Sequence, residues 1–532
     1  MTPRARPRRT IALLLLAGGL AARDSDAQDT TRVLRKRSAY EDLQMFSQVL
    51  NQIRINHPDS LDTHDLIMAA IQGMVRSADP HSYVISAVRL DPERESQLAA
   101  NKLVPLPLTF ELVRGAPVVV SVASGSSARQ ADILPGDLLV AVEGQPVLAE
   151  SVFELDIALS GSKGSFVELA FERRRGDGSR ITLIRQVKRE RVGEATAVPA
   201  AVMLDPGTGY IKVTTFVGEK VADDLRSALE RLEKRGMERL LLDLRDNGGG
   251  SIDEAARVAG EFLPAGQVVY TAGGRKASVV DTGRVKRGYW REQRRYPIVV
   301  MVNEGTASAS ELVAGALQDH DRALIYGRPT FGKSLMMRGF PLTDGSVIVL
   351  VVGQVATPCG RVLQRQYRAI RRSDYYRLAG VDRDTAGRPS CRTDAGRTVF
   401  GGGGIYPDVL SAAATPVPRW LEAAQEKQVV LTWSGTYASE AHELTSLDGL
   451  VANPALSPEA LASFRTFSAK QGAPIPGGAD VDAVLRRVLL EAVAYAKWGE
   501  EGSYRLAAIL DPEVGAAGQL LSRAATLTGT PR

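Results

Sequence analysis

One serine and one lysine, 25 residues apart, have the types and surroundings that best fit nucleophilic catalysis in this chain. Ser308 lies in Asn303-Glu-Gly-Thr-Ala-Ser308-Ala-Ser-Glu311, and Lys333 lies in Gly327-Arg-Pro-Thr-Phe-Gly-Lys333-Ser334. The chain has five histidines and neither a Gly-x-Ser-x-Gly nor a His-Glu-x-x-His segment. If Ser308 attacks a carbonyl, its proton must go to a group other than histidine. A buried lysine can accept it, because burial disfavours the charged amine and lowers its pKa.

The elements around the serine favour the same chemistry. A predicted strand ends at Val302, a glycine-bearing turn follows, and an amphipathic helix is predicted over 308–319. Ser308 would then lie at a helix N-terminus, where unpaired N–H groups favour developing negative charge. An alternative stays open, in which Ser308 or Ser310 only caps this helix and Glu311 completes a Ser-x-x-Glu capping box. Lys333 follows a tight turn after a strand predicted over 324–326.

Composition and charge describe an ordinary globular protein of several domains. The chain has 532 residues, of which 44% are hydrophobic and 24% charged. Residues 1–27 contribute +3 of the net charge of +5, which leaves +2 for the rest. No stripe of basic residues with interleaved aromatics occurs in the sequence, so we expect no nucleic-acid partner.

The N-terminus has the three parts of a secretory signal peptide, predicted over 1–27. Arg4, Arg6, Arg8 and Arg9 form a basic region, an apolar run follows over 11–22, and Ser25-Asp-Ala27 fits a cleavage site. The apolar run is shorter than the roughly 20 residues that a spanning helix needs. We therefore expect an exported protein, periplasmic or extracellular, without stable membrane insertion after cleavage; an uncleaved N-terminal anchor is the alternative.

The two cysteines fit an exported protein. Cys359 and Cys391 could pair in an oxidising compartment, although the sequence does not decide whether they form a disulfide. Two thiols 32 residues apart do not resemble a zinc site, which usually has four ligands in close pairs.

Four regions follow the predicted signal peptide. Helical periodicity predicts an N-terminal helical domain over 28–102, and short apolar runs between turns predict a β domain over 103–192. Strands and helices then alternate over 193–412, which predicts a mainly parallel α/β core, and 413–532 is predicted to be mostly helical. The helical ends leave open a homo-oligomer.

Three segments of the β domain resemble the PDZ domain: Gly125-Ser-Ser-Ala128, Ile133-Leu-Pro-Gly-Asp137 and Val142-Glu-Gly-Gln-Pro-Val147. This resemblance implies a module that binds a peptide C-terminus as an added strand. The stretch corresponding to its carboxylate-binding loop is Val104-Pro-Leu-Pro107-Leu-Thr109, where two prolines remove two N–H donors. A purely structural, PDZ-like gate therefore remains an alternative.

Segments of the core, taken in order, resemble the C-terminal processing (tail-specific) serine peptidases. They are Asp79-Pro-His-Ser, Gly209-Tyr-Ile-Lys, Asp243-Leu-Arg-Asp-Asn-Gly-Gly-Gly250, Ala307-Ser-Ala-Ser-Glu311, Arg322-Ala-Leu-Ile-Tyr-Gly-Arg-Pro-Thr-Phe-Gly-Lys333, Asp344-Gly345, Thr357-Pro-Cys-Gly-Arg361 and Gly403-Gly-Ile-Tyr-Pro-Asp408. The resemblance implies a multidomain α/β protein, with a Clp-protease/crotonase-like peptidase core, an inserted PDZ-like domain and helical ends. It also implies protein substrates recognised through their C-terminal tails, and no cofactor or metal.

The same resemblance assigns roles to residues. Ser308 would be the nucleophile and Lys333 the general base. The oxyanion donors would be the N–H groups of Ala309 and of the glycine turn after strand 240–244, with Gly249 preferred and Gly250 next.

One position departs from the family. The family commonly has a glutamine that orients the lysine four residues beyond it, where this chain has Met337, whose thioether is a weak acceptor. Either another group orients Lys333 or activity is reduced.

Neighbouring polar residues are expected to be structural. Asp319 lies about 16 Å along the predicted helix from Ser308, too far to complete a relay, and we expect it to pair with Arg322 or another nearby base. His320 is expected to be a satisfied residue at the helix end.

Three other functions compete. Gly327–Ser334 also satisfies the P-loop pattern, but a P-loop requires a following helix, and Gly339 and Pro341 predict another strand instead. A Ser-His-Asp protease with an appended PDZ domain lacks a Gly-x-Ser-Gly site. A catalytically weakened, PDZ-bearing scaffold stays open because of Met337 and the two prolines.

Overall fold

The described part of the chain forms two compact units, residues 1–70 and 71–532. The computed structural model describes residues 38–85, 103–113, 116–122, 126–147, 152–174, 180–190, 196–275, 280–286, 294–368, 375, 384–412 and 417–527. The predicted signal peptide, 1–27, lies outside these residues. Among the helices described, none combines the length and the apolarity that crossing a bilayer requires.

The first unit contains α1 (Ala39–Asn56) and the beginning of α2 (Thr63–Ala78). A capping box starts α1, in which the Ser38 N–H donates to Glu41 Oε2 at 2.7 Å and the Glu41 N–H donates to Ser38 Oγ at 3.3 Å. No residue of α1 is buried. Most of its large apolar side chains are exposed: Tyr40, Leu43, Met45, Phe46, Val49 and Ile55.

The β domain is a six-stranded antiparallel sheet in the order β3-β4-β5-β8-β9, with β6 paired to β5. Its elements are β2 (Leu103–Val104), β3 (Leu108–Val113), β4 (Ala116–Val122), α4 (Ser127–Gln130), β5 (Leu138–Val142), β6 (Gln145–Pro146), α5 (Val152–Leu159), β7 (Gly161–Ser162), β8 (Phe166–Arg174) and β9 (Arg180–Lys188). Alternate residues of the strands, such as Leu169 and Phe171, face one apolar core.

The Pro-Gly-Asp turn before β5 has a clear physical role. Gly136 has a φ of 93°, which favours glycine, and the buried carboxylate of Asp137 accepts from the Leu134 N–H at 2.9 Å. Asp137 also pairs with Arg173 on β8 at 2.7 Å. The turn is thus fixed to the sheet by one buried ion pair.

The core sheet has six strands in the order β10-β11-β12-β15-β16-β21, and only β10 runs antiparallel to its neighbour. The strands are β10 (Ala200–Asp205), β11 (Thr208–Lys212), β12 (Arg239–Asp243), β15 (Ile298–Val302), β16 (Leu324–Gly327) and β21 (Val409–Leu410). All of β15 and β16 is buried. Burial on both faces explains why their sequences are continuous apolar runs.

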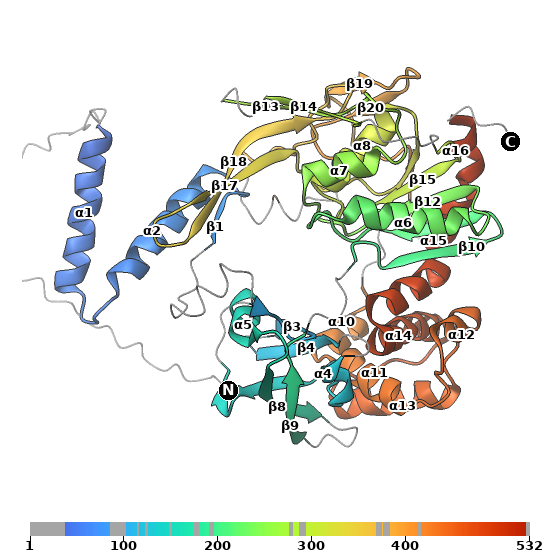
Figure 1. Ribbon diagram of the computed structural model, residues 1–532, viewed down its shortest axis with the longest axis horizontal. Coiled ribbons are helices and arrows are strands. Elements are labelled where there is room, and N and C mark those ends of the chain that lie inside the picture. The colour runs from blue at the N-terminus through green and yellow to red at the C-terminus, as the bar shows by residue number, and fades with distance from the viewer. Residues whose placement is uncertain are drawn as a thin grey trace, which may run out of the picture. The chain divides into compact units, whose positions relative to one another are not determined.

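Helices cover both faces of this sheet (Figure 1). On one face α6 (Val221–Glu233), α7 (Ile252–Ala259) and α8 (Ala309–Asp319) pack against Leu240 and Leu242. On the other, residues of α15 (Pro512–Gln519) and α16 (Leu521–Leu527) pack against Leu241. The C-terminal region thus completes the core: its Ala508, Val514, Ala517, Leu521 and Ala524 belong to the same apolar cluster as Tyr210, Val299 and Met301.

A second sheet has the order β1-β18-β13-β14, with β17 also paired to β18. Its strands are β1 (Tyr83–Ile85), β13 (Val268–Gly274), β14 (Asp281–Arg284), β17 (Leu335–Pro341) and β18 (Val347–Ala356). A strand therefore follows Lys333, as the sequence predicts, and residues 335–341 do not form the helix that a P-loop requires.

Two further parts complete the described chain. The hairpin of β19 (Ser390–Arg392) and β20 (Thr398–Phe400) is joined to the segment after β18 by a Cys359–Cys391 disulfide. The C-terminal helices are α10 (Arg419–Glu426), α11 (Val429–Glu440), α12 (Leu447–Ala452), α13 (Pro458–Lys470) and α14 (Ala479–Leu510), with their own apolar core. The predicted multidomain α/β organisation, with a β domain and helical regions, is confirmed.

Candidate active site

Ser308 lies at the junction between β15 and α8, in a conformation that is rare for its residue type. Its φ is 57° and it is the N-cap of α8, every residue of which is buried. A non-glycine residue with positive φ is strained, and such residues concentrate at functional sites. Ser308 itself is partly exposed, whereas the helix that follows it is buried.

The side chain and backbone of Asn247 hold the glycine turn against this junction. The Asn247 carbonyl accepts from the Ala307 N–H at 3.0 Å and from Ser310 Oγ at 2.9 Å, and its side-chain amide donates to the Val213 carbonyl at 2.9 Å. Asn247 is completely buried. The loop after β12 and the loop after β15 are therefore fixed to each other directly beside Ser308.

Gly249 is in close contact with the Ser308 backbone. Its φ is 95°, and a Cβ built on it would lie 2.8 Å from both Ser308 Cβ and the Ala309 nitrogen. Only glycine fits there without displacement. The Gly249 N–H donates to Asn247 Oδ1 at 3.0 Å. Gly250, with a φ of 150°, follows at an exposed position.

Lys333 is partly buried, and its surroundings disfavour its charged form. Burial lowers the pKa of Lys333 below its ordinary value, against the opposing charges of Glu311 and Asp79. The turn before it is tight, because Gly332 has a φ of 87° and a Cβ there would lie 3.0 Å from the Gly403 carbonyl carbon. A lysine with a lowered pKa has the property that the predicted general base requires.

Glu311 connects the serine to the lysine. Its Oε2 accepts from the N–H groups of Ser308 and Lys333, both at 2.8 Å. Its Oε1 accepts from the Gly332 N–H at 2.7 Å and from Thr330 Oγ1 at 2.5 Å. Burial raises the pKa of this fully buried carboxyl, while these hydrogen bonds act in the opposite direction. The capping pattern in the sequence shows Glu311 near Ser308 but gives no sign of its contacts with the lysine turn.

Met337 lies on β17 opposite Val351 of β18, next to an irregularity in the strand pairing. The Val351 N–H donates to Ser82 Oγ at 3.1 Å, and Ser82 Oγ donates to Asp79 Oδ2 at 2.6 Å. The 79–82 turn therefore brings a carboxylate to the strands that follow Lys333. Sequence reasoning missed this placement, because the turn lies far from Lys333 in the chain.

Comparison with known proteins identifies the family. Residues 207–371 match peptidase family S41, and residues 118–173 match the PDZ domain. The chloroplastic carboxyl-terminal-processing peptidase 2 of Arabidopsis thaliana is 33% identical over 312 residues, which cover 56% of this chain and 59% of that protein. The carboxy-terminal-processing protease of Bartonella bacilliformis is 31% identical over 336 residues, which cover 62% of this chain and 74% of that protein. This chain belongs to peptidase family S41.

The predicted membership of the C-terminal processing serine peptidases, with a PDZ domain, is thereby confirmed. A solved structure, the photosystem II D1 C-terminal processing protease, is 24% identical and covers 71% of this chain and 88% of its own, with a TM-score of 0.36.

Asp319 lies at the far end of α8 in this S41 peptidase and pairs with Arg361, not with Arg322. Asp319 Oδ1 accepts from Arg361 Nη2 at 2.6 Å, and Oδ2 accepts from the Cys359 N–H at 3.1 Å. Both side chains of the pair are buried. His320 contacts Asp394 and the Val268 carbonyl through its two ring nitrogens, at 2.7 and 2.8 Å. Neither residue contacts Ser308 or Lys333 among the interactions of the described chain.

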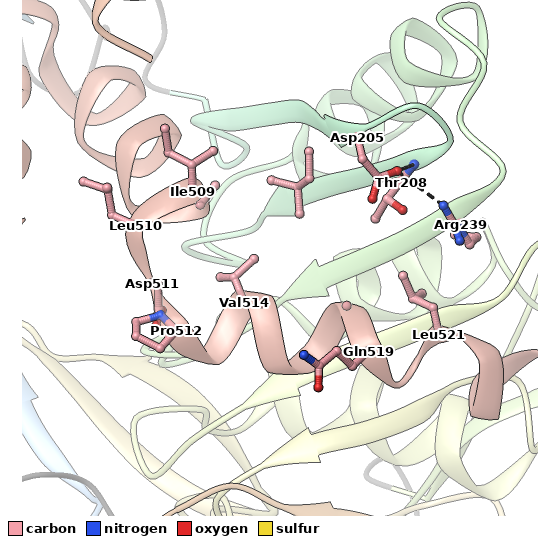
Figure 2. Close-up of a pocket in the computed structure, with 14 residues that line it drawn as sticks. Asp205, Thr208, Arg239, Ile509, Leu510, Asp511, Pro512, Val514, Gln519 and Leu521 are labelled. Atoms are coloured by element: carbon pink, nitrogen blue, oxygen red, sulfur yellow. Dashed lines mark hydrogen bonds and ion pairs between the residues drawn. The ribbon is translucent and has the colours of Figure 1, made fainter. Parts of the chain in front are cut away.

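A pocket of about 600 Å³ lies elsewhere in the peptidase, between the β10–β11 hairpin and the C-terminal helices (Figure 2). Asp205, Thr208 and Arg239 line one side, and Ile509, Val514 and Leu521 the other. None of the predicted site residues lines it. Within the described ranges, no group of three or more His, Cys, Asp or Glu side chains could hold a metal ion.

Proposed function

We propose that this S41 peptidase is an exported serine endopeptidase that cleaves partly unfolded proteins near their C-termini, with Ser308 as nucleophile and Lys333 as general base. The observation that carries this proposal is the Glu311 carboxylate. One of its oxygens binds the N–H groups of both Ser308 and Lys333, so residues from two different loops are held within one short network. The lowered pKa of Lys333 supports its role as a base.

The reaction would proceed by acyl transfer. The neutral Lys333 amine takes the proton of Ser308 Oγ as this oxygen attacks the scissile carbonyl. The lysine ammonium then gives that proton to the leaving amine, the peptide C–N bond breaks, and an ester with Ser308 remains. In the second half, the amine accepts a proton from water as the water oxygen attacks the ester carbonyl. The bond between the acyl carbon and Ser308 Oγ then breaks, the ammonium returns its proton to Oγ, and the new C-terminal carboxylic acid leaves.

Backbone N–H groups would stabilise the oxyanion. The first donor is the Ala309 N–H, which directly follows Ser308 at the N-terminus of α8. The glycine turn would supply the second donor. Because the Gly249 N–H already donates to Asn247 Oδ1, the exposed Gly250 is the better candidate in this conformation, and Gly249 would contribute mainly by its close packing against Ser308.

The PDZ domain would present or gate the substrate tail. The stretch that corresponds to a carboxylate-binding loop, 104–109, runs from the end of β2 into the beginning of β3, with Pro105 and Pro107 between the two strands. Because these prolines offer no N–H groups, tail binding would depend on strand addition more than on carboxylate capture.

Export rests on the predicted signal peptide and on the Cys359–Cys391 disulfide, which fits an oxidising compartment. The exposed apolar side chains of α1 support self-association through the N-terminal helices.

The test compares wild type, Ser308→Ala and Lys333→Ala on an unfolded protein with an apolar C-terminus, between pH 6 and pH 9. We expect cleavage by wild type only. Ser457→Ala is the matched control and should cleave as wild type does, because Ser457 is also a helix N-cap, at the start of α13, where its hydroxyl accepts from the Ala460 N–H. Absence of cleavage by wild type, or full activity in Ser308→Ala, would contradict the proposal.

Met337→Gln then tests the alternative of a catalytically weakened, PDZ-bearing binding protein. A several-fold gain in kcat would identify Met337 as a residue that limits activity. An unchanged kcat in an active enzyme would show that other groups already orient Lys333.

A further inference from the structure

We propose that Glu513, in the C-terminal region, is a positioning residue for catalysis, because its carboxylate binds two arginines that hold together the three loops of the active site. This inference rests on the proposed function, since it concerns the loops that carry Ser308, Lys333 and the glycine turn. In this positioning role Glu513 does not need to touch the substrate.

A helix cap and apolar packing fix the position of Glu513 in the fold. It lies in the first turn of α15, after the N-cap Asp511, whose side chain accepts from the Glu513 N–H at 2.8 Å. Pro512 occupies the first helical position, where its lack of an N–H costs nothing. Val514 and Leu521 are buried in the apolar cluster under the core sheet. Figure 2 shows them on α15 and α16, facing the β10–β11 hairpin.

The first arginine, Arg245, belongs to the loop with the glycine turn. It follows β12 and lies four residues before Gly249. Its Nη1 donates to Glu513 Oε2 at 2.8 Å and to Asp511 Oδ2 at 2.6 Å, while its Nη2 donates to Asp243 Oδ2 at 2.7 Å. This guanidinium therefore ties the beginning of the glycine loop to the C-terminal region.

The second arginine, Arg328, connects the other two loops. It follows β16 and lies five residues before Lys333. Its Nη1 donates to Glu513 Oε1 at 2.7 Å, and its Nε donates to Glu304 Oε2, also at 2.7 Å. Glu304 lies four residues before Ser308. One oxygen of Glu513 thus binds the glycine loop, and the other binds the lysine and serine loops through Arg328.

The ion pairs of Glu513 with Arg245 and Arg328 are partly buried from solvent, so they can stabilise the loops. The side chains of Arg245 and Arg328 are only 14% and 12% exposed, and that of Glu513 is 27% exposed. Burial alone would lower the pKa of Arg328, but Glu304 and Glu513 hold it above its ordinary value. Networks of partly buried charges are worth more than isolated surface pairs, which contribute little.

The fold does not depend on Glu513 alone. The serine and glycine loops are also joined by Asn303 Nδ2, which donates to Asp246 Oδ1 at 2.9 Å, and α15 and α16 are held by apolar packing. Neutralising Glu513 should therefore leave the loops folded but less accurately placed, and errors of about 1 Å in such a site can cost about a hundredfold in rate.

The experiment uses the full-length protein with Glu513→Gln, which removes the charge and keeps the shape. Asp448→Asn is the matched control, since Asp448 pairs with Arg505 at 2.5 Å within the C-terminal region and contacts none of the three loops. The measurements are kcat and KM on the unfolded substrate, the rate at which a fluorophosphonate labels Ser308, and the melting temperature.

For Glu513→Gln we expect kcat and the labelling rate to fall about tenfold or more, with KM changed less than about twofold. Asp448→Asn should match wild type. Arg328→Gln should reproduce the loss, and the double variant should lose less than the product of the two single losses, because both changes break one network.

Three results would overturn the inference. The first is a Glu513→Gln enzyme whose kcat and labelling rate stay within twofold of wild type. The second is a loss of kcat that vanishes when the assays are run well below the melting temperature of the variant. The third is a double variant whose loss of kcat equals the product of the two single losses. A wild type with no Ser308-dependent cleavage or labelling would overturn the proposed function together with this inference. An active wild type that Glu513→Gln equals would overturn this inference alone.

Discussion

Replacing Glu311 with glutamine is the sharpest test of how Ser308 and Lys333 are held. Four donors converge on the two oxygens of this carboxylate, at distances of 2.5–2.8 Å. Glutamine keeps one oxygen and turns the other into an NH₂ group, which cannot accept. If the NH₂ group replaces Oε2, the N–H groups of Ser308 and Lys333 both lose their acceptor. If it replaces Oε1, Thr330 can rotate its hydroxyl, but the Gly332 N–H is left unpaired.

The expected loss of stability in Glu311→Gln follows from the number of buried donors that lose their acceptor. A buried donor without an acceptor costs about 1–3 kcal/mol, so one or two of them predict a loss of roughly 1–6 kcal/mol. The lower desolvation cost of a neutral amide offsets part of this, which leaves about 2 kcal/mol. For a domain of this size, that corresponds to a fall in the melting temperature of roughly 4–8 °C. Because both catalytic loops lose an anchor, kcat should fall about a hundredfold.

The assay pairs calorimetry with steady-state cleavage and fluorophosphonate labelling. Glu254→Gln is the control, because Glu254 follows its cap Ser251 on α7 as Glu311 follows Ser308, and its carboxylate accepts from the Ala222 N–H at 2.9 Å far from the lysine turn. It should lose stability but keep its rate constant per folded molecule. If Glu311→Gln melts within 1 °C of wild type and keeps kcat within twofold, the account of Glu311 is wrong.

Three further predictions follow from the same geometry. Only the neutral amine of Lys333 accepts a proton, so kcat/KM should rise with pH to a plateau. The midpoint of the rise should lie below the ordinary lysine pKa of 10.5. A midpoint at or above that value contradicts the reasoning. Gly249→Ala should lose about a hundredfold in kcat, since its Cβ would press on Ser308. Gly248→Ala, which meets nothing within 4 Å, should not, and equal effects would refute the packing argument. Removing the disulfide with Cys359→Ser and Cys391→Ser should lower the free energy of unfolding by about 2–4 kcal/mol, measured with urea, and an unchanged midpoint would count against it.

Local patterns predict the parts of this protein that local physics determines. The apolar run at 297–302 is β15, and the helix after Ser308 extends to Asp319 as expected. The same holds for the Pro-Gly-Asp turn before β5, whose residue types follow from a positive φ and a buried carboxylate.

Long-range placement could not be read from the sequence. β1 pairs with β18, although more than 250 residues separate them, and no periodicity within 83–85 indicates that partner. Glu311 fits a capping box, so its second role at the lysine turn is invisible until the loops are assembled. The pairing of Asp319 with Arg361 depends in the same way on a loop that returns to the end of α8.

Because α15 and α16 cover one face of the core sheet, the order in which the chain is synthesised affects when that sheet is completed. β21, the last strand of that sheet, ends at Leu410, whereas the C-terminal residues that pack in the same apolar cluster as Leu241 and Met301 begin at Tyr504. A chain that emerges from the ribosome therefore contains Ser308, Lys333 and all six strands of this sheet before it contains the helices that cover the sheet. Until those helices are made, one side of the sheet stays open to water and the loops lack Glu513. The loops that carry Ser308 and Lys333 are thus made well before Glu513, the residue proposed to hold them in place.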